Sequence, residues 1–292
     1  MSKLSEALEG KKFVVTSEIG PPKGTNIEKC LEDAELLRDK VSAINVTDIQ
    51  SAVMRIGSLA ICHLLAEKGL EPVFQMVCRD RNRLALQSDL LSAWVLGIKN
   101  VLCLTGDYTS LGDHPETKPV FDLDSVQLLK TVATLNQGHD IAGHELDGTP
   151  NFFAGAVVTP GCDPLEPQII KMKKKIDAGA KFFQTQSVFE PKKFESFMND
   201  VEKFQVPVMA GIVVLKSAGM AKFMNENVAG VFVPEEIVKE MAETKKEDRR
   251  KKAVEIAARI IREIKPICQG AHIMPLGWDA LVPEIINQAE LS

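Results

Sequence analysis

A junction of helix, glycine and apolar strand recurs along this chain and restricts the fold more than any other feature of the sequence. It surrounds Gly69, Gly97 and Gly179, where a helical stretch stops and an apolar strand begins within a few residues. Glycine suits the left-handed cap at the carboxyl end of a helix, and turns this short are typical of βα units. The junctions therefore predict a chain built from consecutive βα units.

Eight short apolar strands alternate with helices when the whole chain is divided in this way. Pro21 and Pro22 stop the first strand near Ile19, because proline lacks the backbone donor and disfavours helix in the residue before it. The predicted strands are 12–19, 42–48, 71–77, 99–104, 152–158, 181–186, 207–214 and 270–276. The predicted helices are 23–39, 56–69, 82–96, 124–137, 165–178, 191–204, 217–265 and 279–290.

Strict alternation of buried strands and helices is typical of the α/β class. The number of strands favours closure into a TIM (β/α)8 barrel, and an open doubly wound sheet is the alternative. No linker rich in Pro, Gly or Ser divides the 292 residues. We therefore expect one barrel domain over residues 1–292.

Composition excludes several classes of protein. Hydrophobic residues make up 45% of the chain and charged residues 26%, which is typical of a globular protein with an ample core. The net charge is −5 and the basic residues form no stripe, so we expect no nucleic-acid partner. The first twelve residues lack the apolar stretch of a signal peptide, and no apolar run approaches the roughly 20 residues of a membrane span. We expect a cytoplasmic protein.

The six cysteines predict no local metal site or disulfide framework, because no C-x-x-C pair occurs among them. We expect reduced thiols. His139 and His144 share a polar, glycine-rich excursion over 138–151 with Asp140, Glu145 and Asp147. Their spacing is irregular, which favours a solvated surface over a metal site. We therefore expect no metal.

Polar residues stand where the predicted strands end. In a barrel these ends meet on one face, and three carboxylates, two amides and a hydroxyl among them could read a polar heterocycle by hydrogen bonds. Each could instead cap a strand end in water. For Glu18, which ends an apolar strand, the alternative is a solvated glutamate at the start of a loop. The candidates are Glu18, Thr47, Gln75, Asp107, Asp163, Gln186, Lys216 and Trp278.

Four stretches resemble the methylenetetrahydrofolate reductase family. They are SEIGPP at 17–22, NVTD at 45–48, LTGD at 104–107 and KIDAGAKFFQTQ at 175–186. The resemblance extends over about residues 12–289 and implies a flavin-binding TIM barrel. It also implies an oxidoreductase of one-carbon metabolism, which reduces 5,10-methylenetetrahydrofolate toward methionine or acetyl-CoA synthesis.

The resemblance implies roles for individual residues. Glu18 matches the acid that helps to open the imidazolidine ring of the substrate, Asp107 matches an acidic residue near flavin and pterin, and Gln186 matches the pterin-binding glutamine. The implied contacts with the flavin ring are Thr47, Gln75, Leu104, Thr105, Gly106 and Asp107. The implied contacts with its phosphates and nucleotide side are Phe121, Asp122, Asp163, Lys171 and Lys175.

This chain departs from the family pattern at three of these positions. Gln75 and Asp163 stand where the family often has histidine, and Lys171 stands where it has asparagine. The resemblance implies FAD, but Asp163 and Lys171 lie on the nucleotide side of the cofactor, so these departures leave FMN as the alternative. The aromatic residue that covers the benzoyl group of the substrate has no counterpart in 216–223.

The compact length is similar to that of the short reductases of anaerobic bacteria. Some of these work beside a metal-containing subunit that passes electrons to the flavin. The implied electron donor is NADH, with a partner subunit or ferredoxin as rival, and the protein could form homo- or hetero-oligomers. Two other interpretations stay open: a pterin-binding barrel without redox chemistry, such as a methyl-transfer subunit, and a scaffold subunit whose barrel mouth is covered by a partner.

Overall fold

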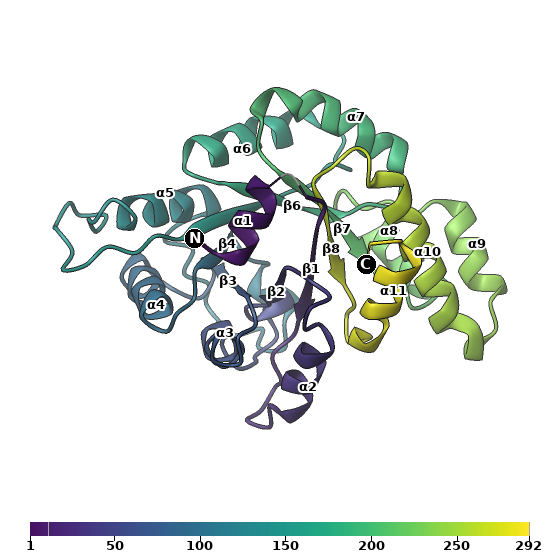
Figure 1. Cartoon of the computed structure of the whole chain (residues 1–292), viewed down its shortest axis with the longest axis horizontal. Coiled ribbons are helices and arrows are strands. Elements are labelled where there is room, and N and C mark those ends of the chain that lie inside the picture. Colours follow the sequence, from purple (N-terminus) through teal and green to yellow (C-terminus); the bar gives the residue numbers. More distant parts are fainter. Residues whose placement is uncertain (11, 292) are drawn as a thin grey trace.

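Eight parallel strands form a closed barrel in the computed structural model, which describes residues 1–10 and 12–291. The strands follow one another around the barrel in chain order, and β8 pairs with β1 through the register Val14 to Gly270 (Figure 1). This closing pair excludes the open sheet and confirms the TIM barrel. The strands are β1 (Val14–Ile19), β2 (Ala43–Val46), β3 (Pro72–Val77), β4 (Asn100–Leu104), β5 (Phe153–Val158), β6 (Phe182–Ser187), β7 (Val208–Val213) and β8 (Gly270–Met274).

Helices surround the barrel, and every predicted helical stretch contains at least one. They are α2 (Glu28–Leu36), α3 (Ser58–Glu67), α4 (Arg83–Val95), α5 (Ser125–Leu135), α6 (Glu166–Asp177), α7 (Pro191–Val201), α8 (Ala218–Asn227), α9 (Glu235–Glu243), α10 (Arg249–Ile264) and α11 (Val282–Gln288). None of the helices that the structure describes is long and apolar enough to span a membrane. The described cysteines are all unpaired, and burial raises the pKa of the Cys78 thiol to about 12.

The glycines of the recurring junction have the predicted conformation. The φ angles are +74° at Gly69, +85° at Gly97 and +113° at Gly179, all in the left-handed region that ends a helix without a Cβ clash. The stretch 217–265, expected as continuous helical material, instead holds three helices. Gly230 at φ +73° and Pro234 at the start of α9 account for the first break.

One helix was not predicted from the sequence. The short α1 (Lys3–Glu9) lies across the end of the barrel that faces the viewer in Figure 1. Its Leu4 and Leu8 are buried against the first residues of several strands, among them Val14, Ala43 and Phe182. The helix therefore closes the amino-terminal end of the barrel with an apolar plug and leaves the opposite end for the site.

Inside the barrel, side chains alternate along each strand between the interior and the helix layer. Near the amino-terminal ends of the strands, the interior is apolar and tightly filled. A Cβ built on Gly155 would lie only 2.2 Å from Cζ of the Phe182 ring. Above this layer the inward residues become polar, beginning with Thr16 on β1 and Asn45 on β2. This change from apolar to polar marks the floor of the candidate site.

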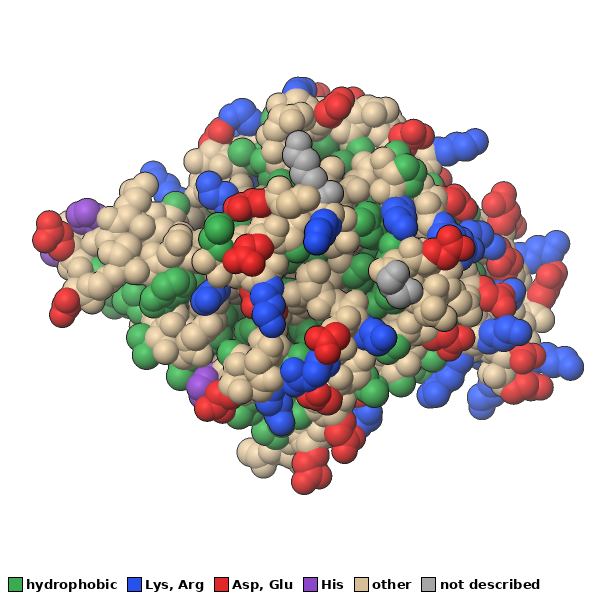
Figure 2. Space-filling model, in the orientation of Figure 1, with side chains coloured by type: hydrophobic (Ala, Val, Ile, Leu, Met, Phe, Trp, Pro, Cys, Tyr) green, Lys and Arg blue, Asp and Glu red, His purple; other side chains and the backbone are tan. Residues whose placement is uncertain are grey.

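The excursion between α5 and β5 projects from the molecule at the left of Figure 1 and carries exposed histidine and acidic side chains in Figure 2. His144 Nδ1 lies 2.9 Å from Asp140 Oδ2. Among the described residues, no three histidine, cysteine, aspartate or glutamate side chains gather in a way that could hold a metal ion.

Candidate active site

Glu18 is buried inside the barrel, at the carboxyl end of β1. Its side chain follows Val14 and Thr16 on the inward face of the strand, and the residue is 7% exposed. Its Oε2 lies 3.6 Å from Nε2 of His272, which is on the neighbouring strand β8. The alternative of a solvated glutamate at a loop start is therefore wrong, and a titratable acid occupies the interior end of the site.

Thr47 lies just beyond the end of β2 and beside the end of β1. Its backbone N–H donates to the Ile19 carbonyl at 3.2 Å, and the residue is 2% exposed. The hydroxyl Oγ1 is buried and has no hydrogen-bond partner among the described residues. A buried hydroxyl without a partner is costly, so its presence here suits a ligand that accepts or donates one hydrogen bond.

The segment after β4 passes close to the end of β3. Gly106 has φ +95°, and a Cβ built on it would lie 3.1 Å from the Cβ atoms of Val77 and Arg79. The preceding Thr105 accepts a hydrogen bond from the Ser125 N–H at 3.2 Å and so joins this segment to the start of α5. Glycine at 106 therefore lets the segment 104–107 pack closely against the end of β3.

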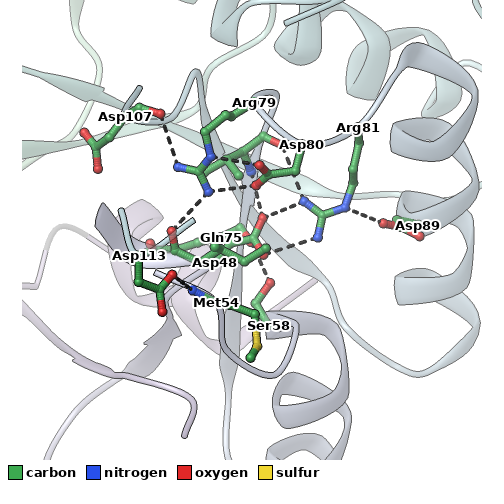
Figure 3. A network of polar contacts seen from close by, with 12 residues as sticks. Asp48, Met54, Ser58, Gln75, Arg79, Asp80, Arg81, Asp89, Asp107 and Asp113 are labelled. Atoms are coloured by element: carbon green, nitrogen blue, oxygen red, sulfur yellow. Dashed lines mark hydrogen bonds and ion pairs between the residues drawn. The ribbon is translucent and has the colours of Figure 1, made fainter. Parts of the chain in front are cut away.

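Asp107 is exposed, and its carboxylate forms no hydrogen bond or ion pair with a described residue. In Figure 3 the carboxylate points away from the Arg79 guanidinium, while the Asp107 carbonyl accepts a hydrogen bond from Arg79 Nη1 at 3.3 Å. The structure thus fixes the backbone of Asp107, but it does not bring this carboxylate into contact with Glu18.

Arg79 joins the segments that follow β2, β3 and β4, and the sequence interpretation missed it. Its side chain is 1% exposed, pairs with Asp80 through Nε at 2.9 Å and Nη2 at 2.7 Å, and donates to the Ile49 carbonyl at 3.1 Å (Figure 3). The Val120 N–H in turn donates to the Arg79 carbonyl at 2.7 Å. One buried guanidinium therefore holds three segments of the barrel mouth together.

A second buried ion pair supports the first. Arg81 Nη1 lies 2.8 Å from Asp48 Oδ2, and its Nε lies 2.9 Å from Asp89 on α4. Asp48 also accepts the Val77 N–H at 3.0 Å. These bonds hold the end of β2 against the end of β3. The residue next to Asp48 is Thr47, whose buried hydroxyl has no partner among the described residues.

Gln186 sits at an irregularity of the barrel. The register between β6 and β7 shifts between Gln184 and Ser187, and the Gln186 amide oxygen accepts the Ser187 N–H at 2.9 Å. Gly211 permits the close approach of the two strands, because a Cβ there would lie 2.3 Å from the Thr185 carbonyl oxygen. Bulges of this kind redirect side chains near active sites.

Gln75 is the remaining candidate for contact with the flavin ring, and a groove lies beside the end of β4. Gln75 is 8% exposed, and its carbonyl accepts a hydrogen bond from Ser58 on α3. The groove has a volume of ≈ 690 Å³ and is lined by Thr105, Gly106, Phe121, Tyr108 and Lys174, among others. The rings of Tyr108 and Phe121 meet edge to face with centroids 6.1 Å apart.

The sequence did not predict Lys174 and Tyr108 as groove residues. Each lies next to a residue that was predicted, Lys175 and Asp107, and the sequence does not show which of two neighbours faces a groove. Lys175, the residue matched by the resemblance, is buried instead, and its Nζ donates to the Val157 carbonyl at 2.6 Å. Desolvation, with nearby Lys171 adding to it, lowers the pKa of Lys175 to about 8.

The other candidates lie around the rim. Asp122 accepts two hydrogen bonds at 2.8 Å from the Arg83 guanidinium, whose bonding lowers the pKa of the carboxyl to about 2. Asp163, Lys171 and Asp107 are exposed. Lys216 Nζ lies 5.5 Å from the centre of the Trp278 ring and donates to the Leu276 carbonyl. None of these rim side chains forms a hydrogen bond or ion pair with Glu18 among the described residues.

Below Glu18, a group of interior polar residues also escaped the sequence interpretation. Thr16, Asn45, Gln184 and His272 are all 4% exposed or less. Alternation along the strands could have revealed them, because Thr16 is two residues from Glu18 and His272 is two residues from Gly270 at the start of β8. Their hydrogen bonds place a connected polar network directly behind the acid.

Comparison with known proteins identifies a family that matches nearly the whole chain. The methylenetetrahydrofolate reductase family profile matches residues 3–290. Methylenetetrahydrofolate reductase 2 of Schizosaccharomyces pombe is 24% identical over 229 residues, which cover 74% of this chain and 35% of that protein. The 5,10-methylenetetrahydrofolate reductase of Pectobacterium carotovorum is 27% identical over 186 residues, which cover 63% of this chain and 57% of that protein.

The chain thus matches about a third of one curated relative and just over half of the other. A solved structure from Clostridium thermocellum, described as binding two copies of 5-methyl-5,6,7,8-tetrahydrofolic acid, has a TM-score of 0.66, 16% identity and 99% coverage of both chains. That likeness shows the shared fold. Because the family profile covers nearly the whole chain, the chain belongs to the methylenetetrahydrofolate reductase family.

Proposed function

We propose that this protein reduces 5,10-methylenetetrahydrofolate to 5-methyltetrahydrofolate with a bound flavin, and that Glu18 is the general acid. The observation that carries the proposal is the burial of Glu18 at the end of β1, with the unpartnered Thr47 hydroxyl at the end of the next strand. Opening the imidazolidine ring requires a proton on the departing nitrogen, and a buried carboxyl is suited to deliver one.

The residues at the carboxyl-terminal end of the barrel fit a flavin. Thr47 offers a hydroxyl that has no partner among the described residues, and the ≈ 690 Å³ groove lined by Thr105 and Gly106 offers room for the ribityl and phosphate groups. When bound, reduced flavin supplies a hydride. The proposed contacts with its ring are Thr47, Gln75, Leu104, Thr105, Gly106 and Asp107.

On the nucleotide side, Phe121 and Lys174 line the groove, and Asp122, Asp163, Lys171 and Lys175 complete the proposed set. Because Lys175 donates to Val157 and Asp122 pairs with Arg83, Lys174 is the lysine that this geometry favours for a phosphate. We propose FAD, with FMN as the rival.

Gln186 and Asp107 are the proposed pterin contacts. The Gln186 oxygen is engaged by Ser187, so its amide N–H groups are the part available to a ligand. The negative charge of Asp107 would favour the cationic iminium formed after ring opening, once its exposed carboxylate turns toward the ligand.

The test begins with the purified protein. Mass spectrometry of the supernatant after denaturation should find FAD or FMN, and the visible spectrum should bleach anaerobically with NADH. Adding methylenetetrahydrofolate to the reduced protein should restore the spectrum and yield methyltetrahydrofolate. If dithionite bleaches the flavin and NADH does not, a partner subunit or ferredoxin is the donor. A colourless protein that binds folate would contradict the proposal and favour a pterin-binding barrel without redox chemistry.

A further inference from the structure

The polar residues behind Glu18 form one connected chain, which we call the interior chain: Asn45, Gln184, Thr16 and His272. They come from β2, β6, β1 and β8 and so cross the barrel from one side to the other. All four are nearly excluded from solvent. Since buried polar groups are costly unless bonded, the direction of each hydrogen bond in this chain is restricted by its neighbours.

The first link is a pair of hydrogen bonds between the two amides. Asn45 Nδ2 donates to Gln184 Oε1 at 2.9 Å, and Gln184 Nε2 donates to Asn45 Oδ1 at 3.1 Å. This reciprocal pair uses one N–H of Gln184. The second N–H of the same nitrogen is directed at Thr16 Oγ1 and His272 Nδ1, both at 3.3 Å. Gln184 is therefore a donor toward β1 and β8.

The next two links follow from that donor. Thr16 Oγ1 accepts from Gln184, so its own proton is directed at His272 Nδ1, 2.9 Å away. With Nδ1 as an acceptor, the proton of the neutral imidazole is on Nε2. Nε2 is the ring nitrogen that faces Glu18 Oε2 at 3.6 Å. This distance exceeds that of a hydrogen bond, and contacts of catalytic groups are often long before a ligand binds.

The charges around this contact come from few groups. Glu18 on β1 is the carboxyl that faces the His272 ring within 4 Å among the described residues. Asp279, at the start of the 3₁₀ helix η5 (Asp279–Leu281), is a second buried carboxyl. Burial raises the pKa of Asp279, and the negative charge of Glu18 adds to that rise. Thr16, Gln184 and Asn45 are neutral. The tautomer of His272 is thus set mainly by the hydrogen bonds of the interior chain.

We propose that Gln184 is a positioning residue for Glu18: through Thr16 and His272 it holds an N–H donor against Oε2, so that the transferable proton is carried by Oε1. The inference rests on the proposed function, since it specifies which oxygen delivers the proton. In the step itself, the C–N bond of the imidazolidine ring breaks, its electron pair takes the proton from Oε1, and the carboxylate that remains is stabilised by the His272 N–H.

Two nearly isosteric variants interrupt the interior chain at successive links: Gln184→Met removes the amide donor, and Thr16→Val removes the hydroxyl. Each should keep the flavin content and the rate of flavin reduction. Each should slow the anaerobic reoxidation of reduced flavin by methylenetetrahydrofolate about tenfold or more, which is a part of the usual contribution of general acid catalysis. The pH at which this activity is lost should move upward, since a carboxylate without the His272 donor holds its proton more tightly.

Non-additivity separates positioning from general damage. Because both residues act through His272, the double variant should be no slower than the slower single variant. Thr131→Val is the control, as its buried hydroxyl donates to the Gln127 carbonyl on α5, away from the interior chain. That control should keep the wild-type rate and pH profile. Losses that multiply in the double variant, or single variants with wild-type profiles, would overturn the proposal.

A spectroscopic readout is independent of activity. In protein labelled with ¹⁵N-histidine, the His272 imidazole should show the Nε2–H tautomer, identified by the signal that disappears in His272→Gln. Gln184→Met should give a mixture of tautomers. An Nδ1–H tautomer in the wild type would overturn the inference even if the protein proves to be a reductase. A wild type that holds no flavin but shows Nε2–H would instead contradict only the proposed function.

Discussion

At the scale of single residues, the site combines one buried acid with polar atoms of two kinds. Some are fully bonded and serve as supports, as Arg79 and Gln184 do. Others lack a partner among the described residues, as the Thr47 hydroxyl does. Because an unpaired buried polar group lowers stability, the second kind indicates where a ligand would complete the hydrogen bonding.

Thr47→Val tests this interpretation. The unfolding free energy should stay constant or rise by about 1 kcal/mol, because the variant replaces an unpaired hydroxyl with a methyl group. Flavin affinity should fall about tenfold through the loss of one hydrogen bond. Urea unfolding of the flavin-free protein and a flavin titration measure the two effects. A destabilised variant that keeps wild-type affinity would show that the hydroxyl is bonded within the protein.

Lys175 predicts a specific pH dependence of stability. Its pKa is about 8 in the folded protein and 10.5 as the ordinary value, so between these pH values the unfolded chain binds one more proton than the folded one. The unfolding free energy should therefore rise with pH across this window, by about 3 kcal/mol at most from this group.

The comparison with Lys175→Met isolates the lysine, since thiol titration affects both proteins equally. The wild type should gain stability relative to the variant as pH increases from 7.5 to 10, in unfolding curves of the flavin-free proteins. A constant difference across this range would mean that Lys175 keeps its ordinary pKa.

At the scale of elements, the segments after β2, β3 and β4 behave as one unit. Arg79 and Arg81 bind carboxylates and carbonyls from all three, and Ile49, Ser51 and Ala52 have φ between +45° and +58°. Such left-handed conformations are unfavourable for residues with a Cβ and persist where the surroundings enforce them. The strained segment therefore depends on the buried ion pairs.

Arg79→Met should destabilise the protein by about 3–5 kcal/mol, because it leaves Asp80 uncompensated and two carbonyls without a donor. Flavin binding should weaken as well, since Gly106 and Thr47 lie on the segments that Arg79 joins. The control is Arg83→Met, which removes an exposed partner of Asp122 and should change stability little. Equal losses in the two variants, measured by chemical denaturation, would contradict the supporting role of Arg79.

The sequence was sufficient to predict the eight strands and their order, and the helices apart from α1 and the division of 217–265. Alternating apolar strands and the capping glycines are local signals, so every predicted strand occurs near its expected bounds. The break in 217–265 was missed because helical periodicity resumes after Pro234. Contacts such as those of Arg79 join residues far apart in the chain, and no local pattern specifies which buried carbonyl a guanidinium will bind.

For the candidate site, the sequence indicated which residues end or follow the strands, but not the side-chain directions. Glu18 and Thr47 are buried, as residues on the inward face of neighbouring strands should be. The expectation that Lys175 faces a phosphate stays a prediction, and its bond to Val157 makes the adjacent Lys174 the better-placed lysine. Neighbouring residues on a helix point about 100° apart. Composition and motifs do not show which of two adjacent lysines faces the groove and which is buried.

At the scale of the whole molecule, closure of the barrel divides it into an apolar and a polar end. The α1 plug seals the amino-terminal end with Leu4 and Leu8, while the interior chain and Glu18 occupy the other end. The apolar plug therefore separates Glu18 from the solvent at the amino-terminal end of the barrel. Stability and chemistry thus belong to opposite faces, as is usual for this fold.

Leu4→Ala tests the structural role of the plug. Leu4 is fully buried, so the variant should lose about 2–5 kcal/mol of unfolding free energy through lost burial and the resulting cavity. Leu84→Ala is the control, since Leu84 is 74% exposed and should contribute little. Flavin content should not change in either variant. An unfolding midpoint equal to that of the wild type would show that α1 does not close the barrel in solution.

In the function that we propose, Glu18 supplies the proton that opens the substrate ring. The most direct measurement is anaerobic single-turnover reoxidation of the reduced flavin by methylenetetrahydrofolate in the wild type and in Glu18→Gln. We expect equal flavin content, equal flavin reduction and a reoxidation rate at least about 100-fold lower in the variant. A variant that reoxidises its flavin at a rate near that of the wild type would contradict this role of Glu18.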